Sequence, residues 1–326
     1  MIDSYRVTAI IYVAARLGIA DILTNGPKSS DELALEVGAH EPSLRRLLRA
    51  LLTVGVCRST HENQFELTEI GRHLADGANQ SLKPWVLFEG GMCWRFWGTL
   101  LDSVRTGKTA PQLAGFDSVF DMMRESPENV ATFNAAMAAF SGAVIPGVLA
   151  AYDFSGITRL IDVGGGHGQL LCAILKANPS LRGCVFDQPR CADGAKRRLV
   201  EAGVSERSEF VAGNFFEGIP DGADAVILKS VIHDWDDEKS AKILRNCRLA
   251  LPAEGRLLLV ERLMTAKPQV NNEDRSVVLS DLNMMLIPGG VERTEDEYRE
   301  LLDSSGFKMT RTLPAGRVNV IECTLA

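Results

Sequence analysis

The second half of the chain alternates short apolar segments with helical ones, and this alternation constrains the fold more than any other feature. Helical segments are expected to begin near His167, Cys191 and Asp236. Short, nearly continuous apolar strands separated by helices are typical of a parallel sheet that is covered on both faces. The expected strands are 159–165, 183–189, 209–215, 223–229 and 255–263.

The end of this region carries one more helix and one more strand. Thr294 followed three residues later by Glu297 is a capping box, which predicts a helix start. The alternating segment 317–325 is expected to close the sheet as an antiparallel edge strand.

The first part of the chain is expected to be helical, and its pattern resembles a winged helix. Ser29 with Glu32 forms a capping box, and Pro42 precedes a leucine stripe with helical spacing. The polar–apolar alternation that follows predicts a hairpin with its turn near Glu62 and Asn63. Such a unit either binds DNA or packs and dimerises. The arginines of its second helix would favour DNA, but the net charge of −7 favours packing. Those arginines are Arg45, Arg46 and Arg49.

Composition excludes several classes of protein. Hydrophobic residues make up 46% of the 326 residues and charged residues 24%, as in ordinary globular proteins. Seven scattered cysteines without a CxxC pair predict reduced thiols in a cytoplasmic protein. No signal peptide and no run of 18 apolar residues is evident, so we expect no membrane partner. The acidic balance also argues against a nucleic-acid partner.

A glycine-rich turn follows the first strand and opens the first helix of the α/β region. Glycines there let the backbone approach a ligand, and the helix N-terminus adds partial positive charge. Dinucleotide-binding proteins have such a turn too, but the spacing here is DxGxGxG. The residues expected to bind a cofactor here are Asp162, Gly164, Gly165, Gly166 and Gly168.

Further candidate ligand residues follow the next strands. Asp187 ends the second strand, where a carboxylate can accept hydrogen bonds from a ribose. A turn carboxylate before Pro189 is the alternative interpretation. Gly213, Asn214 and Phe215 follow the third strand, and Lys229 follows the fourth.

Six segments occur in one order: LIDVGGGHG, FDQP, AGNFF, HDWDDE, VERL and PGGVERT. Together they resemble the small-molecule O-methyltransferases typified by plant caffeic-acid and flavonoid enzymes, with the bacterial natural-product members closest. The resemblance covers nearly the whole chain. It implies a Rossmann-like class I methyltransferase domain that binds S-adenosylmethionine (SAM), an N-terminal winged-helix-like dimerisation domain, a homodimer, and a small aromatic hydroxylated acceptor.

The resemblance also assigns domains and roles. It implies a dimerisation domain over 1–95 and a catalytic domain over 96–326, with a helical substrate-binding segment at 96–150. The glycine loop would hold the amino-acid end of SAM, Asp187 the ribose, and Asn214 with Phe215 the adenine, with Lys229 beside the cofactor. The family commonly has aspartate where this chain has Asn214, and an amide can still hydrogen-bond an adenine edge.

His233, just after the fourth strand, is the candidate general base. Imidazole titrates near neutrality, and a phenol needs a base at neutral pH. By resemblance Glu261 and Glu292 flank the imidazole. A salt bridge from Glu292 to Arg293 or Arg262 is the alternative for that carboxylate. Asp234 either assists His233 or caps the next helix.

Two sets of residues are candidate walls of an acceptor pocket, although each would serve equally well as ordinary core. Both are rich in large apolar side chains, which suit a flat aromatic ligand. No metal site is expected, because these acidic and histidine residues fit acid–base chemistry. The two sets are Phe133, Met137 and Phe140, and Asn283, Met284 and Met285.

Three other functions remain open on the sequence. A SAM-binding relative could hydroxylate, decarboxylate, or methylate nitrogen or carbon. A winged-helix regulator could sense SAM or a metabolite. A dinucleotide oxidoreductase would share the glycine turn and Asp187.

Overall fold

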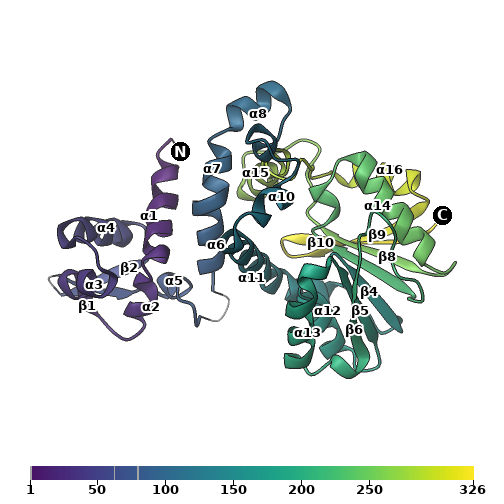
Figure 1. Ribbon diagram of the computed structural model, residues 1–326, viewed down its shortest axis with the longest axis horizontal. Helices are drawn as coiled ribbons and strands as arrows, with labels where there is room; N and C mark the ends of the chain where they lie inside the picture. The colour runs from purple at the N-terminus through teal and green to yellow at the C-terminus, as the bar shows by residue number, and fades with distance from the viewer. Residues whose placement is uncertain (1, 62, 79–80) are drawn as a thin grey trace. The chain divides into compact units, whose positions relative to one another are not determined.

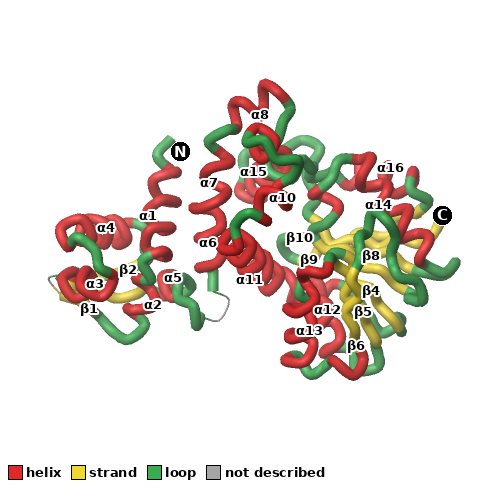
Figure 2. Tube along the Cα trace, viewed as in Figure 1, coloured by secondary structure: helices red, strands yellow, loops and turns green. Residues whose placement is uncertain are grey.

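The computed structural model describes residues 2–61, 63–78 and 81–326, and the chain divides into two compact units (Figures 1 and 2). The first unit comprises residues 1–99 and 120–143, and the second comprises 100–119 and 144–326. The two units therefore interleave along the sequence.

The first unit is mainly helical. Its helices are α1 (Ser4–Arg16), α2 (Ile19–Leu23), α3 (Ser30–Val37), α4 (Glu41–Thr53), α5 (Glu69–Arg72), α6 (Lys83–Phe88), the π-helical turn η1 (Glu89–Cys93), α7 (Trp94–Trp97) and most of α10 (Val119–Arg124). Its strands are β1 (Lys28–Ser29), β2 (Cys57–His61) and β3 (Gln64–Leu67), in the order β1-β3-β2.

The helix starts and the hairpin that the sequence predicts for this unit are confirmed. Ser29 and Glu32 form the capping box of α3, and Pro42 lies in the first turn of α4. Leu44, Leu48 and Leu51 of the leucine stripe are buried in the core of the unit, and Leu47 and Leu52 are partly buried against it. The predicted hairpin is confirmed as β2 and β3. In its predicted turn, Glu62 lies outside the described residues, and Asn63 has a positive φ of 59°.

The second unit is built on a seven-stranded sheet in the order β6-β5-β4-β7-β8-β10-β9. Its strands are β4 (Arg159–Val163), β5 (Arg182–Asp187), β6 (Ser208–Ala212), β7 (Ala225–Lys229), β8 (Arg256–Glu261), β9 (Phe307–Ala315) and β10 (Val318–Leu325). Strands β4 to β8 are parallel, whereas β10 is antiparallel to both of its neighbours.

One expectation about this sheet is wrong in detail. The strand at 317–325 exists and is antiparallel, but β9, which the sequence analysis missed, lies outside it and forms the edge. Polar and charged residues such as Lys308, Thr310 and Arg311 alternate along β9 because an edge strand faces water, and this masks its apolar content.

Helices cover both faces of the sheet, as expected for parallel strands (Figure 1). On one face α14 (Asp237–Ala250) and α16 (Glu295–Ser304) join the core cluster that includes Ile161, Leu228 and Leu259. On the other face α12 (Gln169–Ala177) packs on β5 and α13 (Ala192–Glu201) packs on β6. Other helices of this unit are α8 (Leu100–Thr106), α9 (Ala110–Leu113), α15 (Asn272–Leu286) and the short 3-10 turns η2 (Pro189–Cys191), η3 (Ser205–Arg207) and η4 (Ile232–Asp234).

Helix α11 (Pro127–Ala151) passes from the first unit to the second. By length and composition alone it could cross a membrane, although it contains no unbroken run of 18 apolar residues. Core helices of soluble proteins meet the same test, so this property alone does not indicate a membrane span.

The central sheet should dominate the stability of the second unit. Leu257 in β8 is fully buried, so we expect Leu257→Ala to lower the free energy of unfolding by about 2–5 kcal/mol. Leu249→Ala is the control, because Leu249 is 80% exposed and should change it by less than about 0.5 kcal/mol. Urea unfolding followed by circular dichroism measures both, and equal effects would contradict this account of the core.

Candidate active site

Close contacts leave no room for a side chain at two positions of the glycine loop. Gly164 has a φ of 70°, and a Cβ there would lie 2.8 Å from the Val231 side chain. A Cβ on Gly165 would lie 2.7 Å from the Asp162 carboxylate. The loop therefore presents bare backbone just after the end of β4.

Asp187 closes the loop from the neighbouring strand. Its Oδ2 accepts a hydrogen bond from the Gly166 amide at 2.7 Å, and its Oδ1 accepts one from the Gln188 amide at 2.6 Å. The carboxylate is thus fixed at the carboxyl end of β5, beside the loop. This is the edge where ligands bind in open α/β sheets.

Asp162 and Lys229 form a partly compensated buried pair beneath the loop. Burial raises the pKa of Asp162 to about 7, although the Lys229 ammonium acts in the opposite direction. Burial lowers the pKa of Lys229, and the Asp162 and Glu261 carboxylates oppose that shift. Asp162 Oδ2 has no hydrogen-bond partner within the described part of the chain. A ligand donor would satisfy this buried acceptor.

The third segment of the predicted cofactor site follows β6. A Cβ on Gly213 would lie 2.3 Å from the Phe186 ring, so the chain passes close to β5. The Asn214 Oδ1 accepts a hydrogen bond from the Phe216 amide at 3.1 Å, so this side chain holds its own turn. Phe215 packs against Trp235 with the ring centroids 6.0 Å apart.

His233 lies in the 3-10 turn η4, just past β7. Its Nδ1 is 3.3 Å from Glu292 Oε1 and 3.4 Å from Glu261 Oε2. Its Nε2 is 3.7 Å from Asp234 Oδ1. The His233 side chain is 13% exposed and both glutamate side chains are fully buried. The structure therefore brings together the four residues predicted to act in acid–base chemistry.

The two carboxylates are held in place by separate elements. Glu261, at the end of β8, accepts hydrogen bonds from the Val231 and Ile232 amides at 3.1 and 2.9 Å. Glu292 accepts one from the Ser280 hydroxyl at 2.7 Å. The Glu292 amide donates to Asp281 Oδ1 at 3.0 Å. Helix α15 thereby orients Glu292, a role for Ser280 that the sequence analysis missed.

These contacts determine the charge of the imidazole. Burial by itself lowers the pKa of His233, but the Glu261, Glu292 and Asp234 carboxylates outweigh it and raise the pKa to about 10. Burial raises the pKa of Asp234 to about 6, despite the opposing effect of His233. Burial would raise the pKa of Glu292, yet His233 and Ser280 lower it overall. At neutral pH this arrangement favours an imidazolium beside a carboxylate.

The structure distinguishes between the alternative roles predicted for Glu292 and Asp234. Arg293 pairs with Asp237 rather than with Glu292, at 2.8 Å. The charge of Arg262 lowers the pKa of the Glu292 carboxyl as a minor effect. The N-cap of α14 is Asp236, not Asp234. Glu292 and Asp234 therefore both face His233.

The predicted acceptor walls lie on different units. Asn283, Met284 and Met285 lie near the end of α15, and the Met284 carbonyl accepts hydrogen bonds from the Gly289 and Gly290 amides. On α11, Phe140 stacks on Trp85 and Phe133 meets Phe88 edge-on, with ring centroids 5.9 and 5.8 Å apart. Met137 lies on the same helix. Their role as acceptor walls stays a prediction.

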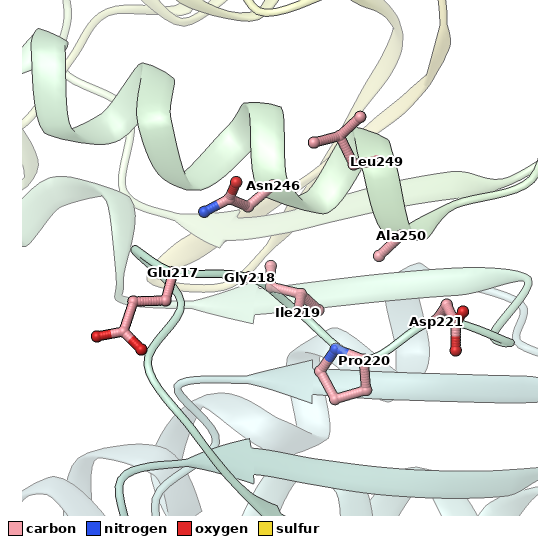
Figure 3. Close-up of a pocket in the computed structure, with 8 residues that line it drawn as sticks. All are labelled: Glu217, Gly218, Ile219, Pro220, Asp221, Asn246, Leu249 and Ala250. Carbon is pink, nitrogen blue, oxygen red and sulfur yellow. The ribbon is translucent and has the colours of Figure 1, made fainter.

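A separate hollow opens between α14 and the loop after β6 (Figure 3). Its lining residues are Glu217, Gly218, Ile219, Pro220, Asp221, Asn246, Leu249 and Ala250. None of the predicted site residues lines it. Within residues 2–61, 63–78 and 81–326, no group of three His, Cys, Asp or Glu residues is placed to hold a metal ion.

The strand order, the bare glycine loop after the first sheet strand and the acidic residue after the next define a class I methyltransferase fold. Residues 97–308 match the model of the O-methyltransferase domain, and residues 1–77 match that of the O-methyltransferase dimerisation domain. The chain therefore belongs to the O-methyltransferase family, which confirms the resemblance seen in the sequence.

Three relatives show the range of the family. The phenazine O-methyltransferase PhzM of Lysobacter antibioticus is 41% identical over 99% of this chain and 94% of its own. A solved structure of the O-methyltransferase NcsB1 from neocarzinostatin biosynthesis, in complex with SAM and 2-hydroxy-5-methyl naphthoic acid, has a TM-score of 0.84 at 32% identity, covering 98% of this chain and 96% of that one. The aclacinomycin 10-hydroxylase RdmB of Streptomyces purpurascens is 34% identical over 93% of this chain and 82% of its own.

The His233 turn should tolerate no side chain at Gly290. A Cβ there would lie 2.0 Å from the His233 carbonyl oxygen, so we expect Gly290→Ala to cost about 1–3 kcal/mol of unfolding free energy. Gly218→Ala is the matched control, because a Cβ there meets no atom within 4 Å. Thermal and urea unfolding compare the two, and an unchanged Gly290→Ala protein would contradict the packing described.

Proposed function

We propose that this chain transfers the methyl group of SAM to a hydroxyl group, phenolic in character, on a small aromatic molecule. His233 would serve as the general base. The observation that carries the proposal is the His233 imidazole, 3.3 and 3.4 Å from two fully buried carboxylates at the edge of the sheet that bears the glycine loop. The O-methyltransferase relatives named above support the same reaction.

The residues around the glycine loop fit the cofactor. Gly164, Gly165, Gly166 and Gly168 would offer bare backbone to its amino-acid end, beside the unsatisfied Asp162 carboxylate oxygen. Asp187 would hold the ribose hydroxyls, and Phe215 with Asn214 and Gly213 the adenine. Lys229 would lie beside the cofactor. When bound, SAM supplies a methyl group on a positively charged sulfur.

His233 would take the proton from the acceptor hydroxyl. A phenol ionises near pH ~10, so at neutral pH its oxygen becomes a strong nucleophile only when a base removes the proton. The Glu261 and Glu292 carboxylates, which lie 3.4 and 3.3 Å from Nδ1, favour the imidazolium that forms. The Nε2 edge, with Asp234 3.7 Å away, would face the acceptor.

We also propose a domain organisation, an oligomeric state and a set of acceptor-binding residues. Residues 1–95 would form a dimerisation domain and 96–326 the catalytic domain of a cytoplasmic homodimer, a view that the dimerisation-domain match supports. The candidate acceptor-binding residues are two separate sets, Asn283, Met284 and Met285 on α15 and Phe133, Met137 and Phe140 on α11. Neither a metal ion nor a nucleic acid nor a membrane would take part.

Removing the proposed base should slow turnover without loosening the cofactor. We expect His233→Ala to lower kcat by about tenfold to a hundredfold or more, the range for losing a general base. The Kd for S-adenosylhomocysteine (SAH), measured by calorimetry, should stay within about twofold. His61→Ala, an exposed change in the first unit, is the control. A His233→Ala protein with near-full turnover would remove His233 from the base role.

The pKa of His233 predicts an alkaline rise in rate. Since the carboxylates raise this pKa to about 10, the neutral imidazole that can accept a proton becomes more abundant as the pH rises from 7 toward 10. We therefore expect kcat/KM to rise over this range. Glu292→Gln removes one negative charge, lowers the pKa of His233 and should move the rise to lower pH.

The control for the pH profile is Glu295→Gln, which removes an exposed carboxylate that pairs with Arg299. Glu295→Gln should leave the pH dependence of kcat/KM unchanged. A profile that stays fixed in Glu292→Gln would mean that the rise belongs to the acceptor hydroxyl and not to His233.

A further inference from the structure

The main chain on both sides of His233 is bound by one buried guanidinium. Arg293 Nη1 donates to the Ile232 carbonyl at 3.3 Å, and its Nη2 donates to the Trp235 carbonyl at 3.0 Å. These two carbonyls flank the His233–Asp234 pair in the chain. The Arg293 side chain is only 2% exposed, so these bonds are shielded from water.

The other contacts of the guanidinium fix its position. Its Nε and Nη2 donate to Asp237 Oδ1 at 3.0 and 2.8 Å, and Nη2 also reaches the Ser240 hydroxyl at 3.3 Å. Its Cζ lies 5.8 Å from the centre of the Tyr298 ring. The turn η4 is thereby tied to the first turns of α14 and to α16. A planar fork with five N–H donors can make these contacts together, and an ammonium cannot.

The segment that carries Arg293 holds His233 from two directions. The Val291 amide donates to the His233 carbonyl at 2.9 Å, the Glu292 carboxylate contacts the imidazole, and Arg293 binds the carbonyls on either side. Val291 therefore holds the main chain of the turn, Glu292 contacts the imidazole ring, and Arg293 again holds the main chain. Any shift of this segment would move the ring and its carboxylate partner together.

We propose that Arg293 is a positioning residue for His233, which it holds in line with the acceptor by binding the Ile232 and Trp235 carbonyls. This inference rests on the proposed function of His233 as the base. Correct placement of a base matters strongly, because a displacement of about 1 Å can cost about a hundredfold in rate.

The turn has enough other contacts to fold without Arg293. The Asp234 and Trp235 amides bond to the Val231 and Ile232 carbonyls, and the Ser240 hydroxyl contacts the Ile232 and Trp235 carbonyls. The Asp237 side chain is 81% exposed, so it can be solvated when its partner is removed. Loss of Arg293 should therefore loosen the turn rather than unfold the unit.

The test compares Arg293→Met and Arg293→Lys with Asp237→Asn in the full-length protein. We expect Arg293→Met to lower kcat at least tenfold, while the KM for SAM and the Kd for SAH stay within about twofold. Arg293→Lys should recover part of the loss, because an ammonium can still donate to one carbonyl. Asp237→Asn should retain most of kcat, because the carbonyl contacts remain. Arg299→Met, which removes an exposed pair on α16, is the control.

A second measurement does not depend on turnover. Histidine labelled with nitrogen-15 gives the titration of His233, which is faced by Glu261 from β8, by Glu292 from the segment after α15 and by Asp234 from its own turn. We expect Arg293→Met to move its pKa toward the ordinary value, because the ring is no longer held against the carboxylates. Asp237→Asn should move it less.

The outcomes separate the two proposals. A lowered kcat with intact SAH binding and a shifted His233 titration supports the positioning role. Wild-type turnover in Arg293→Met, an equal loss in Asp237→Asn, or an unshifted titration overturns it. If the wild-type protein transfers no methyl group, the proposed function fails, and the titration alone still decides whether Arg293 positions His233.

Discussion

The contact between one imidazole and two buried carboxylates is the interaction on which the catalytic unit depends. Removing a carboxylate from water costs several kcal/mol, which only close partners offset. For Glu261 this cost is offset by two backbone amides and His233, and for Glu292 it is offset by the Ser280 hydroxyl and His233. The amides and His233 belong to η4 and the residue before it, Ser280 belongs to α15, and Glu261 ends β8, so these three elements must all be in place for the charges to be tolerated.

The same arrangement explains why chemistry gathers at one edge of the sheet. Parallel strands point their carboxyl ends in one direction, so β4 delivers the glycine loop, β5 Asp187, β7 the His233 turn and β8 Glu261 to that edge. The core beneath is built mainly from apolar side chains, among them Ile161, Leu228 and Leu259. The same sheet thus supports both the stability of the second unit and the residues of the proposed reaction.

Much of this was predictable from the sequence, for local reasons. Strands β4 to β8 read directly as apolar runs, both capping boxes formed as predicted, and His233, Glu261 and Glu292 each lie next to a recognisable strand end or motif. What the sequence did not predict depends on contacts between distant segments. The edge strand β9 is masked by its polar face. The partnership of Ser280 with Glu292, and of Arg293 with Ile232, arises only once the segment after α15 is folded against α15 and η4.

The central claim is that the acceptor atom is oxygen. The most direct test incubates the wild-type protein with SAM labelled in its methyl group and with matched hydroxyl- and amino-substituted phenazines and naphthalenes, and locates the label in the product by NMR and mass spectrometry. The account predicts label on the oxygen of a hydroxylated acceptor and none on its amino counterpart. Label on nitrogen or carbon, or an acceptor that gains oxygen without gaining label, would contradict it.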